Sequence, residues 1–175
     1  MNILVTGDLG YIGSILVPTL LNKGYEVTGL DCGYFEENLL EEYKSDYKKI
    51  NKDIRDVTVD DLSGVDYIIH LAALSNDPLG EFSPELTEEI NYKATMKIAK
   101  IAKLVGVKRF IYASSQSMYG VSDVSEELDE EISKKNPVTA YAKAKWKAEI
   151  ELQSLASDDF IITSFRPSTV FGASP

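Results

Sequence analysis

Three glycines near the N-terminus are spaced in a way that suits the binding of a diphosphate. They stand at Gly7, Gly10 and Gly13, directly after a short apolar run, and a helical pattern follows at once. The first glycine permits a tight turn, the second allows the backbone to approach a pyrophosphate closely, and the third allows helix and strand to pack tightly. The loop, which includes Tyr11 and Ile12, would hold the diphosphate on main-chain N–H groups at the positive end of the helix dipole.

An acid follows the second apolar run. A carboxylate at Asp31 would accept hydrogen bonds from both ribose hydroxyls of an adenosine and would repel a 2′-phosphate. Between Asp31 and Tyr43 the sequence has no Lys or Arg that could hold such a phosphate. The sequence therefore predicts NAD rather than NADP as the cofactor. The alternative for Asp31 is a solvated strand end.

The elements that must position these residues alternate regularly. Ser83, Pro84 and Glu85 supply a capping residue, a first-turn proline and an early acid for the second of the expected helices. The alternation predicts βαβ units and a doubly wound α/β fold with a parallel sheet, formed by residues 1–175 as one domain. We expect strands at residues 2–6, 26–30, 47–50, 65–71, 109–113 and 161–165, and helices at residues 11–23, 84–105 and 139–157.

Composition excludes several classes of protein. The 175 residues include 18 Lys+Arg and 28 Asp+Glu, a net charge of −10, and 44% are hydrophobic. This is ordinary globular composition, and its acidity argues against a nucleic-acid or anionic-membrane partner. A single Cys and a single His exclude a disulfide framework and argue against a metal site. With neither a secretion signal nor a membrane-length apolar run, a cytoplasmic location is expected.

Further motifs follow in a consistent order. Together with the glycine loop, they make nearly the whole chain resemble the extended short-chain dehydrogenase/reductases, specifically the NAD-dependent nucleotide-sugar epimerase/dehydratase family. The resemblance implies a Rossmann fold, an NAD cofactor and a nucleotide-sugar substrate. The motifs are Asp53-Ile54-Arg55-Asp56, His70-Leu71-Ala72-Ala73, Asn91, Ser114-Ser115-Gln116-Ser117-Met118-Tyr119-Gly120, Tyr141-Ala142-Lys143-Ala144-Lys145 and Arg166-Pro167-Ser168-Thr169-Val170-Phe171-Gly172.

The resemblance also implies which residues meet the cofactor. Asp53 matches the acid that binds the adenine amino group, with Ile54 beside it. The strand end that lines the cofactor is matched by Leu71, Ala72 and Ala73. Asn91 matches a buried helix asparagine near the active site, and Pro167 matches a proline whose backbone approaches the nicotinamide carboxamide.

Three residues match the catalytic set of the family: Ser115, Tyr141 and Lys145. The tyrosine and the lysine are separated by one helical turn, so both can reach one ribose. A free tyrosine has a pKa of about 10 and is a poor base at neutral pH. We expect the Lys145 ammonium and the positive nicotinamide ring to lower the pKa of Tyr141. Tyr141 would then remove a sugar hydroxyl proton, which Ser115 helps to orient, while hydride passes to the nicotinamide.

Two departures from the family bear on the reaction. The two positions after the catalytic serine are acids in the sugar 4,6-dehydratases, but here they are Gln116 and Ser117. This disfavours dehydration and favours a 4-epimerase. Another dehydrogenase, reductase or dehydratase reaction and a catalytically silent NAD-binding module remain as alternatives. The chain also ends at Pro175, before the smaller C-terminal region that grips the nucleotide sugar in the family, so we expect NAD binding but poor turnover by this chain alone.

Other features have competing interpretations. The helices at 84–105 and 139–157 match those of a four-helix dimer interface, which predicts a homodimer. The polar connection 120–136 is either a solvated loop or a flap beside the substrate. His70 is expected to be a packed strand-end residue rather than a general base, and Trp146 to pack in the core or at the dimer interface. Acids cluster at Glu36, Glu37, Glu41 and Glu42. A second acidic cluster lies within the connection 120–136, at Glu126, Glu127, Asp129, Glu130 and Glu131.

Overall fold

The chain forms one parallel sheet with helices on both faces. The computed structural model describes residues 1–34, 36, 46–121 and 127–173. Within them the strand order is β3-β2-β1-β4-β5-β6, and every neighbouring pair is parallel. The order reverses between β1 and β4, which confirms the doubly wound Rossmann arrangement and places a ligand crevice beyond the carboxyl ends of these two strands. The strands are β1 (Asn2–Thr6), β2 (Glu26–Asp31), β3 (Lys48–Asn51), β4 (Tyr67–His70), β5 (Arg109–Ala113) and β6 (Ile161–Phe165).

The strand bounds lie within two residues of the expected ones: β3 is shifted by one residue from 47–50, and β4 begins at Tyr67 instead of residue 65. β1, β5 and β6 have the expected limits, and β2 extends by one residue to include Asp31. β4 ends at His70 instead of Leu71, because the amides of both Leu71 and Ala72 donate to the carbonyl of Thr6, at 3.0 and 3.1 Å. The chain therefore leaves the sheet at the point where it turns toward the glycine loop.

The expected helices are present, and one more was missed. α1 spans Gly13–Asn22 and α5 spans Ala140–Gln153. The expected helix at 84–105 is one continuous run made of α3 (Pro84–Glu88), a π-helical turn (Glu89–Ala94) and α4 (Thr95–Leu104). The sequence analysis did not predict the short helix α2 (Asp77–Phe82).

The capping prediction for α3 is only half right. Pro84 begins the helix as expected, but the Ser83 side chain makes no capping hydrogen bond. Instead the Ser83 carbonyl accepts from both the amide and the hydroxyl of Thr87, each at 2.9 Å. At the start of α5 the Thr139 hydroxyl caps the helix, since it accepts from the Ala142 amide at 3.1 Å.

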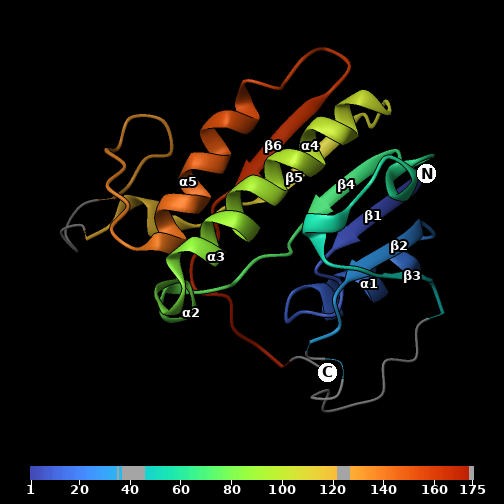
Figure 1. The fold of residues 1–175 in the computed structure, drawn as a ribbon, viewed down its shortest axis with the longest axis horizontal. Coiled ribbons are helices and arrows are strands. Elements are labelled where there is room, and N and C mark those ends of the chain that lie inside the picture. The colour runs from blue at the N-terminus through green and yellow to red at the C-terminus, as the bar shows by residue number, and fades with distance from the viewer. Residues whose placement is uncertain (35, 37–45, 122–126, 174–175) are drawn as a thin grey trace.

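The core lies on both sides of the sheet, as the alternation of side chains along a strand requires. In β1, Leu4 contributes to a cluster formed with α4 and α5, whereas Ile3 and Val5 contribute to a cluster with Val17 and Leu20 of α1. Figure 1 shows α3, α4 and α5 as a layer across one face of the sheet, with α1 placed apart from them near β2 and β3. None of the described helices has the length and apolar character needed to cross a bilayer.

Candidate active site

The glycine loop lies between the carboxyl ends of β1 and β4, and its three glycines have different roles. Gly7 has a φ of +75°, and a Cβ there would lie 2.7 Å from the amide nitrogen of Ala72. A Cβ on Gly13 would overlap the carbonyl oxygen of Gly7, so this glycine is needed for packing within the loop. A Cβ on Gly10 would meet only that same oxygen, at 3.3 Å. A Cβ at Gly10 therefore has only this one close neighbour in the protein. That the bare backbone at Gly10 serves a ligand stays a prediction.

The loop is joined to its neighbours by main-chain hydrogen bonds. The Gly7 amide donates to the carbonyl of Leu30 in β2 at 2.9 Å. Ile12 is the N-cap residue of α1, and its carbonyl accepts from the amides of Ile15 and Leu16, while the Ser14 amide donates to the Gly10 carbonyl at 2.9 Å. Binding of an anion at this helix N-terminus stays a prediction. Tyr11 uses its hydroxyl to donate to the Gly172 carbonyl at 2.6 Å, which brings the end of the described chain to the loop. These features fit the diphosphate of a dinucleotide.

The acids expected to bind adenosine lie at the same edge of the sheet. Asp31 ends β2, and its Oδ1 accepts from the Gly33 amide at 2.8 Å. Asp53 caps the turn that follows β3 and forms an ion pair with Arg55 at 2.8 Å, which lowers the pKa of Asp53. Ile54 beside it is buried. Cofactor contact by these residues, and by Ala73, stays a prediction.

A buried acid within the loop was not anticipated. Asp8 is 1% exposed, and its Oδ2 accepts from the hydroxyl of Tyr47 at 2.7 Å. Its Oδ1 is buried without a hydrogen-bond partner among the described residues. Burial raises the pKa of Asp8. The hydrogen bond from Tyr47 lowers this pKa and the nearby charge of Asp31 raises it, and the net shift is upward. A glycine at position 29 makes room for this carboxyl group, since a Cβ there would overlap it. In the sequence, the only sign of this buried acid was a polar residue between the first two glycines of the loop.

The structure brings the three expected catalytic residues together. Tyr141 and Lys145 lie on α5, and Ser115 follows the end of β5. The Ser115 side chain lies near the phenol of Tyr141 and lowers its pKa, while the Ser115 hydroxyl donates to Ser117 Oγ at 3.1 Å. The Nζ atom of Lys145 lies 5.8 Å from the centroid of the Tyr141 ring. All three groups therefore face one point at the carboxyl edge of the sheet.

The ionisation of this site differs from the expectation. Burial raises the pKa of Tyr141, the Ser115 side chain lowers it, and the charge of Asp77 raises it. Burial also lowers the pKa of Lys145 to about 7. Our expectation that the Lys145 ammonium lowers the pKa of Tyr141 is therefore wrong for the protein groups by themselves. Desolvation outweighs it, because it disfavours charge on both side chains.

The short helix α2 packs against the start of α5, beside Tyr141. A Cβ on Gly80 would lie 2.8 Å from the Cβ of Tyr141, so the helix and the tyrosine are in close contact. Asp77 accepts from the Thr139 hydroxyl at 2.5 Å, and Glu81 accepts from the Ala140 amide at 2.5 Å. Two acids thus hold the first turn of α5, where negative charge is favourable. The sequence alone did not reveal this contact, because it joins segments far apart in the chain.

Asn91 has an indirect role in the structure. It is fully buried, its Oδ1 accepts from the Leu74 amide at 2.8 Å, and its Nδ2 donates to the Leu74 carbonyl at 3.0 Å. Both ends of the amide are therefore used to order the loop after β4. Direct contact between Asn91 and the cofactor stays a prediction.

His70 is a packed strand-end residue, as expected. It is fully buried, with Nδ1 2.7 Å from the hydroxyl of Thr6 and Nε2 2.9 Å from the hydroxyl of Thr95. Burial lowers its pKa to about 3, with a further contribution from Lys145. The ring is neutral and joins β1 to α4.

The turn after Ser115 lies next to Pro167, the residue that is expected to contact the nicotinamide. Ser115 caps this turn, because its hydroxyl oxygen accepts from the Ser117 amide at 3.1 Å. The Gln116 amide donates to the carbonyl of Pro167 at 3.2 Å, which places this proline beside the catalytic turn. Contact between Pro167 and a nicotinamide stays a prediction.

The two acidic clusters are only partly described. Of the first cluster, Glu36 forms a long ion pair with Lys49 at 3.9 Å, while Glu37, Glu41 and Glu42 lie outside the described residues. In the second, Glu126 lies outside the described residues, and residues 127–132 are exposed. No group of three or more potential metal-ligating side chains occurs in the described part of the chain.

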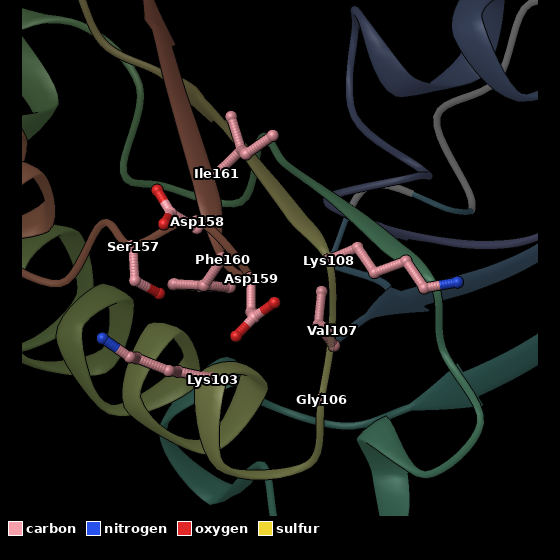
Figure 2. A pocket seen from close by; sticks show the side chains of 9 residues that line it. All are labelled: Lys103, Gly106, Val107, Lys108, Ser157, Asp158, Asp159, Phe160 and Ile161. Atoms are coloured by element: carbon pink, nitrogen blue, oxygen red, sulfur yellow. The ribbon is translucent and has the colours of Figure 1, made fainter.

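A separate hollow lies at the opposite edge of the sheet. It has a volume of about 480 Å³ and is formed by the end of α4 and the segments that lead into β5 and β6. Figure 2 shows its lining residues, among them Lys103 and Lys108, which point away from each other. These amines are engaged elsewhere, with the Leu155 carbonyl at 2.7 Å and with Asp66 at 3.4 Å. This hollow is remote from the catalytic groups.

A doubly wound sheet, a glycine loop at its switch point and a Ser–Tyr–Lys set at the same edge define a dinucleotide-binding protein of the dehydrogenase/reductase type. The sequence model of the NAD dependent epimerase/dehydratase family matches residues 3–175. The chain belongs to this family.

Relatives of known activity include both reaction types. The UDP-glucose 4-epimerase of Mycolicibacterium smegmatis is 32% identical, and the match covers 98% of this chain and 57% of the relative. The dTDP-D-glucose 4,6-dehydratase of Mus musculus is 30% identical, with 97% and 50% covered. The UDP-glucose 4-epimerase of Thermus thermophilus, solved in complex with NAD, has a TM-score of 0.81 and 26% identity, with 95% and 54% covered. The chain thus spans about half the length of these relatives.

Proposed function

We propose that this chain is the NAD-binding and catalytic part of a nucleotide-sugar 4-epimerase. The observation that carries the proposal is the convergence of Ser115, Tyr141 and Lys145 beside the glycine loop. The fit to NAD rests on Gly10, where a Cβ would have only one close neighbour in the protein, and on the carboxylate of Asp31 at the end of β2. Residues 1–175 form the domain that performs both tasks.

The chain's own residues supply acid–base chemistry and orientation. When bound, NAD supplies a hydride acceptor and a positively charged ring, which favours the phenolate of Tyr141. The Tyr141 oxygen takes the proton of the sugar 4-hydroxyl and later returns it. Ser115 lies near that phenol and orients the hydroxyl. The buried Lys145 holds the helix against the strand end and, with a pKa of about 7, exchanges a proton near neutral pH.

Epimerisation is favoured over dehydration by the residues beside Ser115. Gln116 and Ser117 have no carboxyl group, so neither can drive the elimination of water. The similarity to a dehydratase keeps dehydration as the second candidate. The helices α4 and α5 support a homodimer, which sedimentation of the purified protein tests: a monomer at micromolar concentration contradicts it. A cytoplasmic location is part of the same proposal.

Product analysis of the full-length gene product with NAD and a panel of nucleotide sugars tests the function. A 4-epimerase gives an isomer of equal mass with no net NADH. Net NADH would indicate a dehydrogenase, and loss of one water a dehydratase. Protein that binds NAD but converts no member of the panel would contradict the proposal.

A further inference from the structure

An ion pair lies next to the catalytic residues, between the buried Glu149 and Arg166, whose side chain is 18% exposed. Glu149 is 5% exposed and lies on α5, one helical turn after Lys145. The Nη2 atom of Arg166 donates to Glu149 Oε1 at 2.6 Å, and Nε donates to the same oxygen at 3.1 Å. Because Arg166 follows β6 directly, the pair joins the catalytic helix to the end of the neighbouring strand.

The carboxylate also holds the residue before the catalytic serine. The hydroxyl of Ser114 donates to Glu149 Oε2 at 2.5 Å, and the amide of Ser114 donates to the carbonyl of Phe165 at 2.9 Å. Ser114 is therefore fixed at both its side chain and its backbone. The backbone that carries its neighbour Ser115 is therefore anchored on the Ser114 side.

The guanidinium group has two further partners, both beyond the ion pair. Its Nη1 atom donates to the hydroxyl of Tyr119 at 2.6 Å and to the carbonyl of Glu130 at 2.7 Å. Tyr119 ends the turn that begins after Ser115, and Glu130 belongs to the acidic connection. The charge of Arg166 thus holds the catalytic turn and the connection together.

The connection returns to the same turn at its far end. The Asn136 amide donates to the carbonyl of Met118 at 2.8 Å, and a Cβ on Gly120 would overlap the Asn136 carbonyl. Lys135 donates to the carbonyl of Glu130 at 2.8 Å, the same oxygen that Arg166 binds. The described residues 127–136 are therefore docked on the catalytic turn, although many of their side chains are exposed.

We propose that Glu149 and Arg166 are positioning residues. Their ion pair fixes the direction of Ser115 and holds residues 127–136 against the catalytic turn. The catalytic hydroxyl and the adjoining wall of the substrate site are thereby positioned together. This rests on the proposed function. The guanidinium spreads its donors over three nitrogens, so Arg166 binds the carboxylate through Nε and Nη2 and reaches the phenol and the carbonyl through Nη1. A lysine has all its donors on one nitrogen and cannot span the same partners. The guanidinium carbon of Arg166 lies 5.7 Å from the centroid of the Trp146 ring. Packing of Trp146 in the core or at a dimer interface stays a prediction.

A merely stabilising role would not require charge. Well-packed apolar side chains often stabilise a protein as well as a buried ion pair does, since both charges lose their hydration. The pair also binds groups on both sides of the catalytic serine, Ser114 before it and Tyr119 after it. Its effect is therefore expected on the geometry of the chemical step, and not on cofactor affinity.

The test compares Glu149→Gln with Glu151→Gln in the full-length gene product. The control lies on the same helix and bonds the hydroxyl of Tyr92 at 2.5 Å, away from Arg166. Glu149→Gln should lower kcat about tenfold, because a charged hydrogen-bond partner is lost, and leave the Kd for NAD unchanged. A lysine-specific protease should cut at Lys134 and Lys135 about tenfold faster. The control should match the wild type in all three measurements.

Arg166→Lys serves as the second variant if Glu149→Gln does not fold. It keeps the charge but loses the simultaneous contacts, so the same changes in kcat and cleavage are expected. Unchanged kcat in a folded variant would overturn the inference, even if cleavage is faster. Wild-type cleavage would overturn the docking of residues 127–136. If the wild type itself converts no nucleotide sugar, the proposed function fails, whereas the cleavage rates still decide whether the pair holds the connection.

Discussion

The side-chain amine of Lys145 donates a hydrogen bond to the carbonyl oxygen of Ala113, and the two atoms are 2.9 Å apart. Ala113 is the last residue of β5, so this bond fixes α5 to the strand that leads into Ser115. The amine is fully buried, and burial lowers the pKa of Lys145 to about 7. One lysine thus sets the spacing of the catalytic groups and holds a weakly bound proton beside them.

The lowered pKa of Lys145 predicts a change of stability at alkaline pH. The unfolded chain keeps this proton up to pH 10.5, whereas the folded chain loses it near pH 7. The unfolded state therefore binds more protons in this window, and the free energy of unfolding should rise with pH by a contribution on the order of a few kcal/mol. Urea denaturation at several pH values measures it. Lys145→Met should remove the rise, and Lys143→Met, exposed on the same helix, should keep it; equal slopes in both variants would refute the assignment.

Tyr141→Phe should separate chemistry from binding. The change removes the atom that exchanges the substrate proton but keeps the ring that packs on α2. Turnover of the full-length gene product should fall by about 10² to 10⁴, the usual contribution of a positioned acid–base group. The Kd for NAD should stay within a few-fold of the wild-type value. Undiminished turnover in this variant would eliminate Tyr141 as the base.

Replacement by alanine should destabilise the protein at Gly13 but change its stability little at Gly10. Gly13→Ala forces a Cβ into the Gly7 carbonyl and should destabilise the fold by about 1–3 kcal/mol. Gly10→Ala meets only one atom, at 3.3 Å, and should change the free energy of unfolding by about 0.5 kcal/mol or less. Thermal or urea denaturation of the two variants without NAD makes the comparison. A larger loss at Gly10 would show that the loop is packed differently.

Asp8→Asn should stabilise the protein at neutral pH. Because burial raises the pKa of Asp8, the folded state binds its proton more tightly than the unfolded state does. The group therefore contributes most stability below its unfolded pKa of 3.8 and loses this contribution as pH rises through its folded pKa. At pH 7 the buried charge is unfavourable, and an uncharged amide removes the cost. Denaturation at pH 7 should show the gain, and a loss there would mean that the charged form has an unseen partner.

Local patterns were enough to predict much of the fold and the site. The apolar runs Ile3-Leu4-Val5 and Tyr67-Ile68-Ile69 are buried on both faces, so their strands could be placed from the sequence. The glycine spacing and the one-turn separation of Tyr141 and Lys145 are equally local, and they determine where the loop and the catalytic groups lie.

What the sequence did not reveal depends on contacts between distant segments. Burial raises the pKa of Tyr141 in the absence of the nicotinamide, and the contact of α2 with the start of α5 beside it joins segments far apart in the sequence. The double hydrogen bond of Asn91 to Leu74 and the ion pair of Glu149 with Arg166 are hidden for the same reason. Composition and periodicity indicate which face of a helix or strand is buried, but they do not indicate which distant segment packs against that face.

The central claim is that the bare backbone at Gly10 receives the diphosphate of NAD while Asp31 holds its adenosine. Isothermal titration calorimetry of the folded chain with NAD, beside a Gly10→Val variant of equal thermal stability, tests it most directly. We predict one site per chain for the wild type, much weaker binding of NADP, and no detectable heat for the variant. A folded wild type that releases no heat with NAD, or a variant that binds it equally well, would contradict the account.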